Sequence, residues 1–265
     1  MEPDEFNILT ETRYGRMLYN RNDVYIGRSM ELYGEFSYGE SRLFESILKP
    51  GMNVVEVGAN IGSHTIPIAK AAGPQGLVHV FEPQRLVFQA LCANVALNQL
   101  TNVVPHYAAS GEEEGTLLVP ELEPKARNNF GGLGLGDFDT GRKVPVVPID
   151  TLDLPACHFI KADVEGMEES VLRGAEKTIS RFRPVLYVEN DRREKSVSLI
   201  RYIDSLGYRI YDHRPPLFHA ENFKGNSENV FPKIVSRNLF CVHRSTPSNI
   251  TGFREVVPPK EEDGS

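Results

Sequence analysis

From residue 53 onward the sequence alternates apolar runs with runs of helical spacing, and this alternation is the strongest constraint on the fold. Apolar runs typical of buried strands fall at 53–58, 77–82, 103–107, 159–163, 185–189, 208–212 and 239–243. Helices are predicted at 39–49, 61–72, 85–98, 167–179 and 195–206. Strands that alternate with helices form a parallel sheet with helices on both faces. The sequence therefore predicts an α/β, doubly wound domain with a mostly parallel, seven-stranded sheet.

The remaining segments define the predicted domain organisation. Residues 1–50 are expected to form an N-terminal arm and helix that pack on the core, with short β runs at Met17–Tyr19 and Val24–Ile26. The main domain is expected to span 51–244. Residues 245–265 are polar and rich in proline, and they are expected to form a disordered tail.

Two long segments interrupt the alternation inside the main domain. Residues 111–148 are rich in Gly and Pro, and residues 214–236 lie between the last two predicted strands. Long loops on the ligand side of a rigid sheet often carry substrate recognition. We expect these loops to contact the substrate, although surface decoration would explain their composition as well.

Composition limits the class of protein. An apolar content of 40% and a charged content of 25% predict a packed core, and no apolar run approaches the roughly 18 residues of a membrane span. The acidic N-terminal residues lack the apolar stretch of a secretory signal. Three widely spaced cysteines match neither a zinc site nor a disulfide framework, which indicates a reducing, cytoplasmic location. The net charge of −7 argues against nucleic acid as a partner.

The stretch VVEVGANIGSHT (54–65) has the pattern of a strand, a glycine loop and a helix. A dinucleotide-binding loop would read G-x-G-x-x-G, but here Asn60 stands two residues after Gly58, where its side chain would occupy the space of a pyrophosphate. Glu56 precedes the loop, and a carboxylate there suits a positively charged ligand. Glu82 ends the next strand, where it could accept hydrogen bonds from ribose hydroxyls. An ammonium, a sulfonium and a ribose together predict S-adenosylmethionine.

With these residues in place, the sequence resembles the FkbM-type methyltransferases, within the class I, Rossmann-like fold that uses S-adenosylmethionine. The matching stretches are YGEFSYGESRLF (33–44), LKPGMNVVEVGANIG (48–62), FEP (81–83), IKADVEGMEESVLRGA (160–175) and GYRIYDHRPPLFHAENFKGN (207–226). The resemblance covers roughly residues 13–244. The family usually has Asp where this chain has Glu56, and often a β-branched residue at Ala162, and neither departure removes a needed function.

The resemblance implies the reaction and the cofactor contacts. Family members methylate oxygen on varied acceptors, often sugars or natural products. The residues that would contact the cofactor are Glu40, Glu56, Gly58, Asn60, Gly62, Glu82, Ala108 and Asp163. Of these, Glu56 to Gly62 and Glu40 would hold the methionine part, Glu82 the ribose, and Ala108 would lie beside the adenine.

A hydroxyl acceptor loses a proton during methylation, so a base at the strand ends is expected. Asp163, Glu189 and His213 are the catalytic candidates, and His213 is equally compatible with a solvent-facing role. Asp163 with Glu189 and Asn190 also resembles the Mg²⁺ ligands of catechol O-methyltransferase. Glu165 and Gly166, however, replace that family's lysine-bearing turn, so a metal-free site is the expectation.

The acceptor itself cannot be identified from the sequence. A small molecule, carbohydrate or glycosylated, is expected, with Asn129, Phe130, Asn190, Asn222 and Phe223 as candidate contacts. Turn formation explains Asn222 and Phe223 almost as well. A peptide or lipid acceptor, an NAD-dependent oxidoreductase and a cofactor-binding scaffold without catalysis are the alternatives, and a homo-oligomer is compatible with the sequence.

The acids of IKADVEGMEE (160–169) are expected to act separately. Asp163 alone ends the strand, and Glu165 stands at the start of the following helix, where the helix dipole favours it. Glu168 could cap that helix or face the pocket. Glu169 is expected on the solvent side, paired with Arg173 four residues later.

Overall fold

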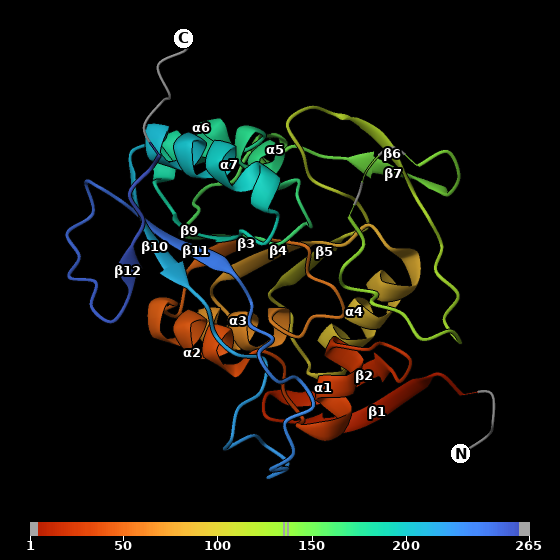
Figure 1. Ribbon diagram of the computed structural model, residues 1–265. Helices are drawn as coiled ribbons and strands as arrows, with labels where there is room; N and C mark the ends of the chain where they lie inside the picture. The colour runs from red at the N-terminus through yellow and green to blue at the C-terminus, as the bar shows by residue number, and fades with distance from the viewer. Residues whose placement is uncertain (1–4, 135, 137, 260–265) are drawn as a thin grey trace.

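The computed structural model describes residues 5–134, 136 and 138–259, and its centre is one eight-stranded sheet (Figure 1). The strand order is β12-β10-β11-β9-β8-β3-β4-β5. The strands are β3 (Asn53–Val57), β4 (Leu77–Phe81), β5 (Val103–His106), β8 (Phe159–Ala162), β9 (Val185–Glu189), β10 (Tyr208–His213), β11 (Asn238–His243) and β12 (Arg254–Glu255). All seven predicted strands are present, and β11 runs antiparallel to its neighbours β9 and β10.

Helices cover both faces of the sheet, as the alternation predicts (Figure 1). One layer contains α2 (Tyr38–Ile47), α3 (Thr65–Ala72) and α4 (Arg85–Leu97), and the other contains α5 (Glu168–Arg173), α6 (Glu176–Phe182) and α7 (Arg193–Ser205). A short 3₁₀ helix, η1, spans Ile149–Leu152. The chain leaves β3 toward β4 and β5 and later returns to β8 on the other side of β3. This reversal separates the connections beyond the carboxyl ends of β3 and β8, which is where such sheets bind ligands.

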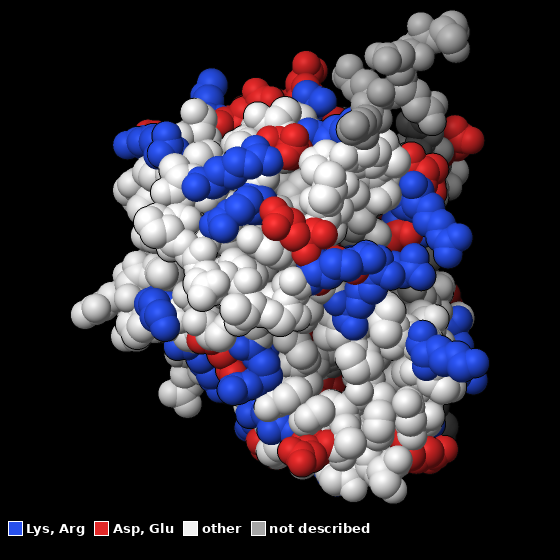
Figure 2. Space-filling model, turned by 60° about the vertical axis from the view of Figure 1, so that its left-hand side comes forward, with Lys and Arg blue, Asp and Glu red and all other residues white. Residues whose placement is uncertain are grey.

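Charged side chains of both signs are interspersed over the face of the molecule shown in Figure 2. Within the part of the chain that the structure describes, no helix combines the length and the apolar character that crossing a membrane requires.

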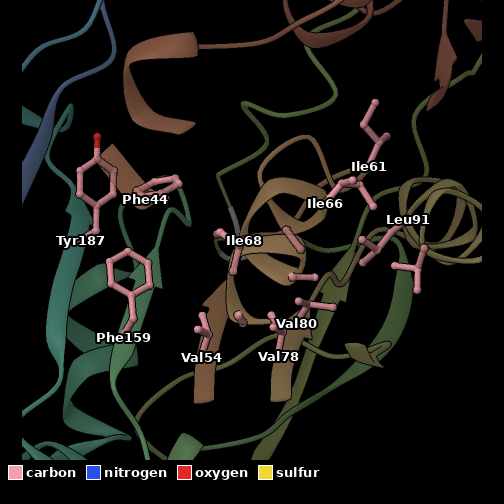
Figure 3. Packing of buried hydrophobic residues seen from close by; sticks show 14 of the residues in the cluster. Phe44, Val54, Ile61, Ile66, Ile68, Val78, Val80, Leu91, Phe159 and Tyr187 are labelled. Carbon is pink, nitrogen blue, oxygen red and sulfur yellow. The ribbon is translucent and has the colours of Figure 1, made fainter. Parts of the chain in front are cut away.

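The core has two apolar layers, one on each face of the sheet. On β3, Val54 packs in the layer beneath α2–α4 and Val55 in the layer beneath α5–α7, because successive strand residues point to opposite faces. Phe44 of α2 holds the first layer to the sheet through edge-on ring contacts with Phe159 and Tyr187, at centroid distances of 5.5 and 4.9 Å (Figure 3). Burying such aromatic rings fixes the position of α2 over the middle of the sheet.

The N-terminal arm differs in part from the prediction. It contains the hairpin of β1 (Asn7–Thr12) and β2 (Gly15–Asn20), followed by helix α1 (Ile26–Leu32). The run Val24–Ile26, expected to be β structure, instead leads into α1. Asp23 explains the difference, because its side chain accepts a hydrogen bond from the Tyr25 N–H (2.9 Å) and its carbonyl accepts one from the Arg28 N–H (3.0 Å).

The helix predicted at 167–179 is broken into α5 and α6. A Cβ at Gly174 would lie 2.0 Å from the carbonyl oxygen of Gly111, so the chain at this glycine packs directly on another backbone. The Asp150 carboxylate then accepts hydrogen bonds from the N–H groups of Lys177 and Thr178 (2.9 and 2.8 Å), which starts α6 separately.

The two interrupting segments and the tail have structure of their own. Residues 111–148 contain the hairpin of β6 (Gly115–Val119) and β7 (Arg142–Val146). Residues 214–236 pack on the N-terminal arm, where Phe218 and Phe231 contact the Tyr33 ring edge-on. The tail expected to be disordered instead adds β12 to the sheet, and Phe253 packs against Phe240 (5.5 Å between centroids). Residues 260–265 lie outside the described part.

A histidine pair on β4 and β5 supplies a stability prediction. His79 Nδ1 lies 3.0 Å from His106 Nε2, and burial lowers the pKa of both imidazoles. Below the ordinary histidine pKa the unfolded chain binds protons that the folded pair excludes, so the pair costs stability as pH falls below about 6.5. We expect chemical denaturation between pH 7 and pH 5 to show a shallower loss of stability in His106→Gln than in the parent chain. An unchanged or steeper loss would contradict this role.

Candidate active site

A cavity of about 410 Å³ opens at the carboxyl edge of the sheet, beyond β3, β4, β8 and β9. Its lining comes from the glycine loop, the 111–148 segment, α2, the end of β9 and the 214–236 segment. The predicted site residues that line it are Glu40, Gly58, Asn60, Glu82, Asn129, Asp163 and Glu189.

The glycine loop is shaped by close backbone contacts. Gly58 has φ +81°, and a Cβ there would lie 1.8 Å from the carbonyl oxygen of Asp163, so glycine is required. Gly58 and Ala59 donate backbone hydrogen bonds to the Phe81 carbonyl (3.1 and 3.0 Å). Gly62 lies outside the cavity lining, where it allows the loop to approach Leu91 of α4. The loop therefore fixes the positions of the ends of β3, β4 and β8 relative to one another.

Glu82 connects the loop to the next strand end. Its carboxylate accepts hydrogen bonds from the N–H groups of Asn60 (3.0 Å) and Gln84 (2.8 Å), and burial raises its pKa to about 7. Each carboxylate oxygen can accept a further hydrogen bond. Two backbone hydrogen bonds thus hold the Glu82 carboxylate in place at the cavity, where it could accept hydrogen bonds from the hydroxyls of a ribose.

Glu56 and Ala108, two of the predicted cofactor contacts, lie away from the cavity. Glu56 is fully buried behind the loop, accepts a hydrogen bond from Thr65 Oγ1 (2.6 Å) and has an oxygen 3.9 Å from Lys161 Nζ. Burial raises the pKa of Glu56 to about 7. Ala108 is buried in the apolar layer beneath α5–α7. A direct contact with a ligand in the cavity is not supported for either residue.

A buried lysine links three acids near the cavity. Lys161 is 2% exposed, and its Nζ lies 2.9 Å from Asp163 Oδ2. Asp163 follows β8, lines the cavity and is partly exposed. Glu40 of α2 is also buried at the cavity wall, where Ser37 Oγ donates to it (2.7 Å), and burial raises its pKa while Lys161 opposes the rise. Lys161 supplies the positive charge that these carboxylates share.

Three half-buried acids near Asp163 form a cluster in the cavity wall. Glu165, Glu189 and Asp191 each place one oxygen within 4.8 Å of the others, and we call them the acidic cluster. Arg192 forms ion pairs with Glu165 and Asp191. Burial, followed by the charges of Asp163 and Glu165, raises the pKa of the Glu189 carboxyl. This shift favours the protonated form and makes Glu189 a less suitable proton acceptor than its place at a strand end suggests.

The set that resembles a Mg²⁺ site is not brought together. Asp163 is bound to Lys161, while Asn190 lies outside the cavity lining and donates its backbone N–H to the Arg237 carbonyl (2.7 Å). Among the residues that the structure describes, the acids close enough to share a cation are those of the acidic cluster, with Asp191 in place of Asp163.

His213, the third catalytic candidate, does not line the cavity. Its Nδ1 lies 2.8 Å from the Tyr187 hydroxyl, its ring packs against Phe253, and burial lowers its pKa. His64, at the start of α3, is buried between Phe36 and Phe44.

The remaining acceptor candidates are dispersed. Asn129 lines the cavity, but Phe130 is buried in the apolar layer beneath α2–α4. Asn222 holds a turn by donating to the carbonyls of His219 and Asn226 (2.9 and 2.7 Å). Phe223 is 47% exposed beside Gly34. The turn interpretation of Asn222 accounts for its contacts.

The acids after β8 separate as the sequence predicts. Glu168 Oε1 accepts hydrogen bonds from the N–H groups of Val164 (3.1 Å) and Gly166 (2.9 Å), which decides between capping and facing the pocket in favour of capping. Glu169 forms the expected ion pair with Arg173 (2.8 Å).

Several residues that line the cavity were missed at the sequence level. Asp191 and Arg192 stand two and three residues beyond Glu189, the last residue of β9, and this position after a strand end could have indicated them. Ser236 and Asn238 stand at the start of β11. Because β11 is antiparallel, its first residues lie at the edge where the parallel strands end. The expectation that ligand-binding residues follow the carboxyl ends of strands does not include residues at the start of an antiparallel strand, so it overlooks Ser236 and Asn238.

The cavity fits S-adenosylmethionine. Its volume is that of a small-molecule site. Gly58 and Asn60 would accommodate the methionyl part, and Glu82 would accept the ribose hydroxyls. Glu40 would supply a carboxylate for the positively charged methionyl end.

Comparisons with known proteins agree with this fit. The model of the Methyltransferase FkbM domain matches residues 56–210. The 31-O-demethyl-FK506 methyltransferase FkbM of Streptomyces tacrolimicus is 27% identical, over 74% of this chain and 87% of that protein. A tRNA(Phe) (4-demethylwyosine(37)-C(7)) aminocarboxypropyltransferase of Methanocaldococcus jannaschii is 41% identical over 61 residues, which are 23% of this chain and 24% of that protein.

Solved structures with the same fold include a methyltransferase FkbM from Methylobacillus flagellatus KT (TM-score 0.52, 22% identity, 77% of this chain). The alignment covers 50% of that structure, so the chain spans about half its length. A precorrin-6y C5,15-methyltransferase from Geobacter metallireducens GS-15 also aligns (TM-score 0.51, 12% identity, 77% of this chain and 87% of that chain). With the family match over more than half of its length, this chain belongs to the FkbM methyltransferase family, whose methyl donor is S-adenosylmethionine.

Proposed function

We propose that the protein transfers a methyl group from S-adenosylmethionine to a hydroxyl of a small acceptor: a sugar, a glycoside or another natural product. The observation that carries the proposal is the position of Asp163. Its backbone carbonyl contacts the glycine loop, and its carboxylate, ion-paired with Lys161, lines the cavity. One residue thus stands between the cofactor side and the acceptor side. The name of the Streptomyces tacrolimicus relative, a 31-O-demethyl-FK506 methyltransferase, supports an oxygen acceptor.

The residues would act mainly by positioning. S-adenosylmethionine supplies an electrophilic methyl group on a sulfonium, and the S–C bond breaks with its electron pair as the O–C bond forms. Asp163 accepts the proton of the hydroxyl, and Lys161 holds the carboxylate in place at 2.9 Å. Holding the hydroxyl in line with the methyl group can supply about 7–11 kcal/mol of the barrier reduction.

The two interrupting segments would close the site over both ligands. Asn129, Gly131 and Gly132 from 111–148, and Leu217 and Ile234 from 214–236, line the cavity. We propose residues 51–244 as the catalytic unit with these segments as its recognition elements. The three free cysteines support a reducing compartment such as the cytoplasm.

Methyl-transfer assays with tritiated S-adenosylmethionine over sugars, glycosides, peptides and lipids test the proposal. Transfer to a hydroxyl of a sugar or natural product is expected, and it should persist in the presence of EDTA. Transfer confined to peptides or lipids would contradict the acceptor class. Loss of activity with EDTA would show that a metal is required.

Glu82 provides a test of the cofactor side. Glu82→Gln keeps the size of the side chain. Its amide NH₂, however, would face one of the two backbone N–H groups that donate to the carboxylate in the parent chain. We expect the affinity for S-adenosylhomocysteine, measured by calorimetry, to fall about 10–100-fold, as for loss of a charged hydrogen-bond acceptor. Glu121→Gln, an exposed acid paired with Arg85, is the control and should bind normally. Tight NAD binding without S-adenosylhomocysteine binding would support the oxidoreductase alternative.

A further inference from the structure

Part of the cavity lining is apolar and belongs to a single packed cluster. Tyr25, Phe36, Leu217 and Ile234 line the cavity, and all four pack in the apolar cluster that contains the buried Tyr33 ring. We call these four residues the apolar wall. Leu217 is 7% exposed, and the other three are only partly buried. Apolar surface left open inside a concave site is typical of a surface that a ligand covers.

The two segments that form the apolar wall are fixed to each other. Glu35 of the N-terminal arm is 3% exposed and accepts hydrogen bonds from Arg13 Nε and from the Phe223 N–H (3.1 Å). Its other oxygen lies 3.1 Å from His219 Nδ1. A buried carboxylate with three partners holds the 214–236 segment on the arm. The apolar wall is therefore a built surface of the cavity.

The strand order separates the 214–236 part of the apolar wall from the cofactor contacts. Gly58, Asn60 and Glu82 follow β3 and β4. Leu217 and Ile234 belong to the connection between β10 and β11, and β11 lies on the other side of β3, beyond β8 and β9. The acceptor must approach the methyl group from a side that the donor leaves open. This part of the apolar wall is on that side.

The apolar wall adjoins the polar part of the cavity. The Phe36 ring packs on the ring of His64 (5.7 Å between centroids), whose Nε2 lies 3.9 Å from Glu40. Ser37 Oγ donates to Glu40 (2.7 Å) and lies 3.4 Å from the Ser236 hydroxyl. A free sugar has hydroxyls in every direction, and those placed against the apolar wall would lose their hydrogen bonds to water. A ligand that matches both parts is polar at one end and apolar at the other.

Resting on the proposed methyl transfer, we propose that the acceptor is amphipathic, with its reacting hydroxyl next to an alkyl, aryl or alicyclic group that covers the apolar wall. The hydroxyl lies toward Asp163. Apolar contact is not directional, so the apolar wall selects the class of acceptor and the polar groups select the hydroxyl. Free sugars are then poor acceptors.

The test compares glucosides that share every hydroxyl and differ only in the apolar group. Methyl, butyl, hexyl and phenyl β-glucosides are titrated by calorimetry into the protein with S-adenosylhomocysteine bound. A fully buried methylene raises affinity by about fourfold. Because the apolar wall covers one side of the ligand, we expect hexyl glucoside to bind about 10–100-fold more tightly than methyl glucoside, with a more negative heat-capacity change. Equal affinities along the series, or no binding of the hexyl and phenyl glucosides, would overturn the inference.

A pair of matched variants tests whether the apolar wall is the cause. Ile234→Thr keeps the β-branched shape and replaces apolar surface by a hydroxyl, so the preference for hexyl over methyl glucoside should fall by at least about threefold. The affinity for S-adenosylhomocysteine should not change. Ile8→Thr, at a partly buried isoleucine of β1 outside the cavity lining, is the control and should keep the full preference. An unchanged preference in Ile234→Thr, or weaker binding of S-adenosylhomocysteine, would contradict an acceptor-binding role.

The inference and the proposed function fail in different ways. If S-adenosylhomocysteine binds and free sugars are methylated as well as their alkyl glycosides, the methyltransferase function stands and only the role of the apolar wall is wrong. If S-adenosylhomocysteine does not bind, the proposed function itself is wrong.

Discussion

Replacing Asp163 with asparagine is expected to lower the rate of methyl transfer by about 10²–10⁴-fold, the usual contribution of a positioned general base. Asparagine keeps the shape of the side chain. Its amide oxygen can still accept a hydrogen bond from Lys161 Nζ, which lies 2.9 Å from the Asp163 carboxylate in the parent chain. What it loses is the capacity to take the proton of the acceptor hydroxyl. The contact with Gly58 is made by the backbone of Asp163, so the glycine loop should stay in place.

The measurement separates chemistry from binding. Single-turnover methyl transfer gives the rate, and calorimetry with S-adenosylhomocysteine gives the affinity, which should remain close to that of the parent chain. Glu169→Gln serves as the control for a lost carboxylate in the same segment. Full turnover in Asp163→Asn would exclude a catalytic role, and a large loss of S-adenosylhomocysteine affinity would make Asp163 a cofactor contact instead.

The sequence predicts the strands well because burial on both faces leaves a plain pattern. Phe159–Ala162, for example, is apolar on both sides of the sheet apart from Lys161. The broken helix at Gly174 could not be predicted, because the break depends on the Gly111 carbonyl, about sixty residues away in the chain. Strand β12 likewise forms only because β10 offers an edge. These differences come from tertiary contacts that local spacing does not encode.

The site residues also divide into those that the local sequence predicts and those whose position depends on tertiary contacts. The rule that ligand-binding residues follow parallel strands identifies Glu82, Asp163 and Glu189, which line the cavity. It fails for Asn238, whose strand runs the other way. Strand alternation places Glu56 on the same side as Gly58, but the cavity begins beyond the loop, and Glu56 faces Lys161 and Thr65 instead.

Lys161→Met is expected to cause a large loss of stability, and the loss should grow with pH. The lysine is 2% exposed between Asp163 at 2.9 Å and Glu56 at 3.9 Å. Removing one partner of a buried charge network typically costs about 3–5 kcal/mol, because the remaining carboxylate is left unpaired. Methionine has nearly the same length and no charge, so lost packing contributes little.

The pH dependence follows from Glu56, whose pKa is about 7 in the folded parent chain with Lys161 opposing the effect of burial. Without Lys161 this pKa rises further. A carboxyl with a raised pKa binds more protons in the folded state, so its favourable contribution is lost as pH rises toward the folded pKa. Below pH 7 Glu56 is protonated in both proteins and contributes little difference. Above pH 7 the gap in unfolding free energy should widen by up to about 1.4 kcal/mol per pH unit.

A double substitution tests whether Glu56 is the cause. In Glu56→Gln/Lys161→Met the buried acid is neutral at every pH, and Thr65 Oγ1 can still donate to the amide oxygen. Urea denaturation at pH 6 and pH 8.5 should therefore show a wide gap for Lys161→Met at the higher pH and a nearly constant gap for the double variant, each measured against Glu56→Gln and the parent chain. A pH-independent loss in Lys161→Met would mean that the lysine stabilises the fold through Asp163 and packing, and that Glu56 needs no counter-charge.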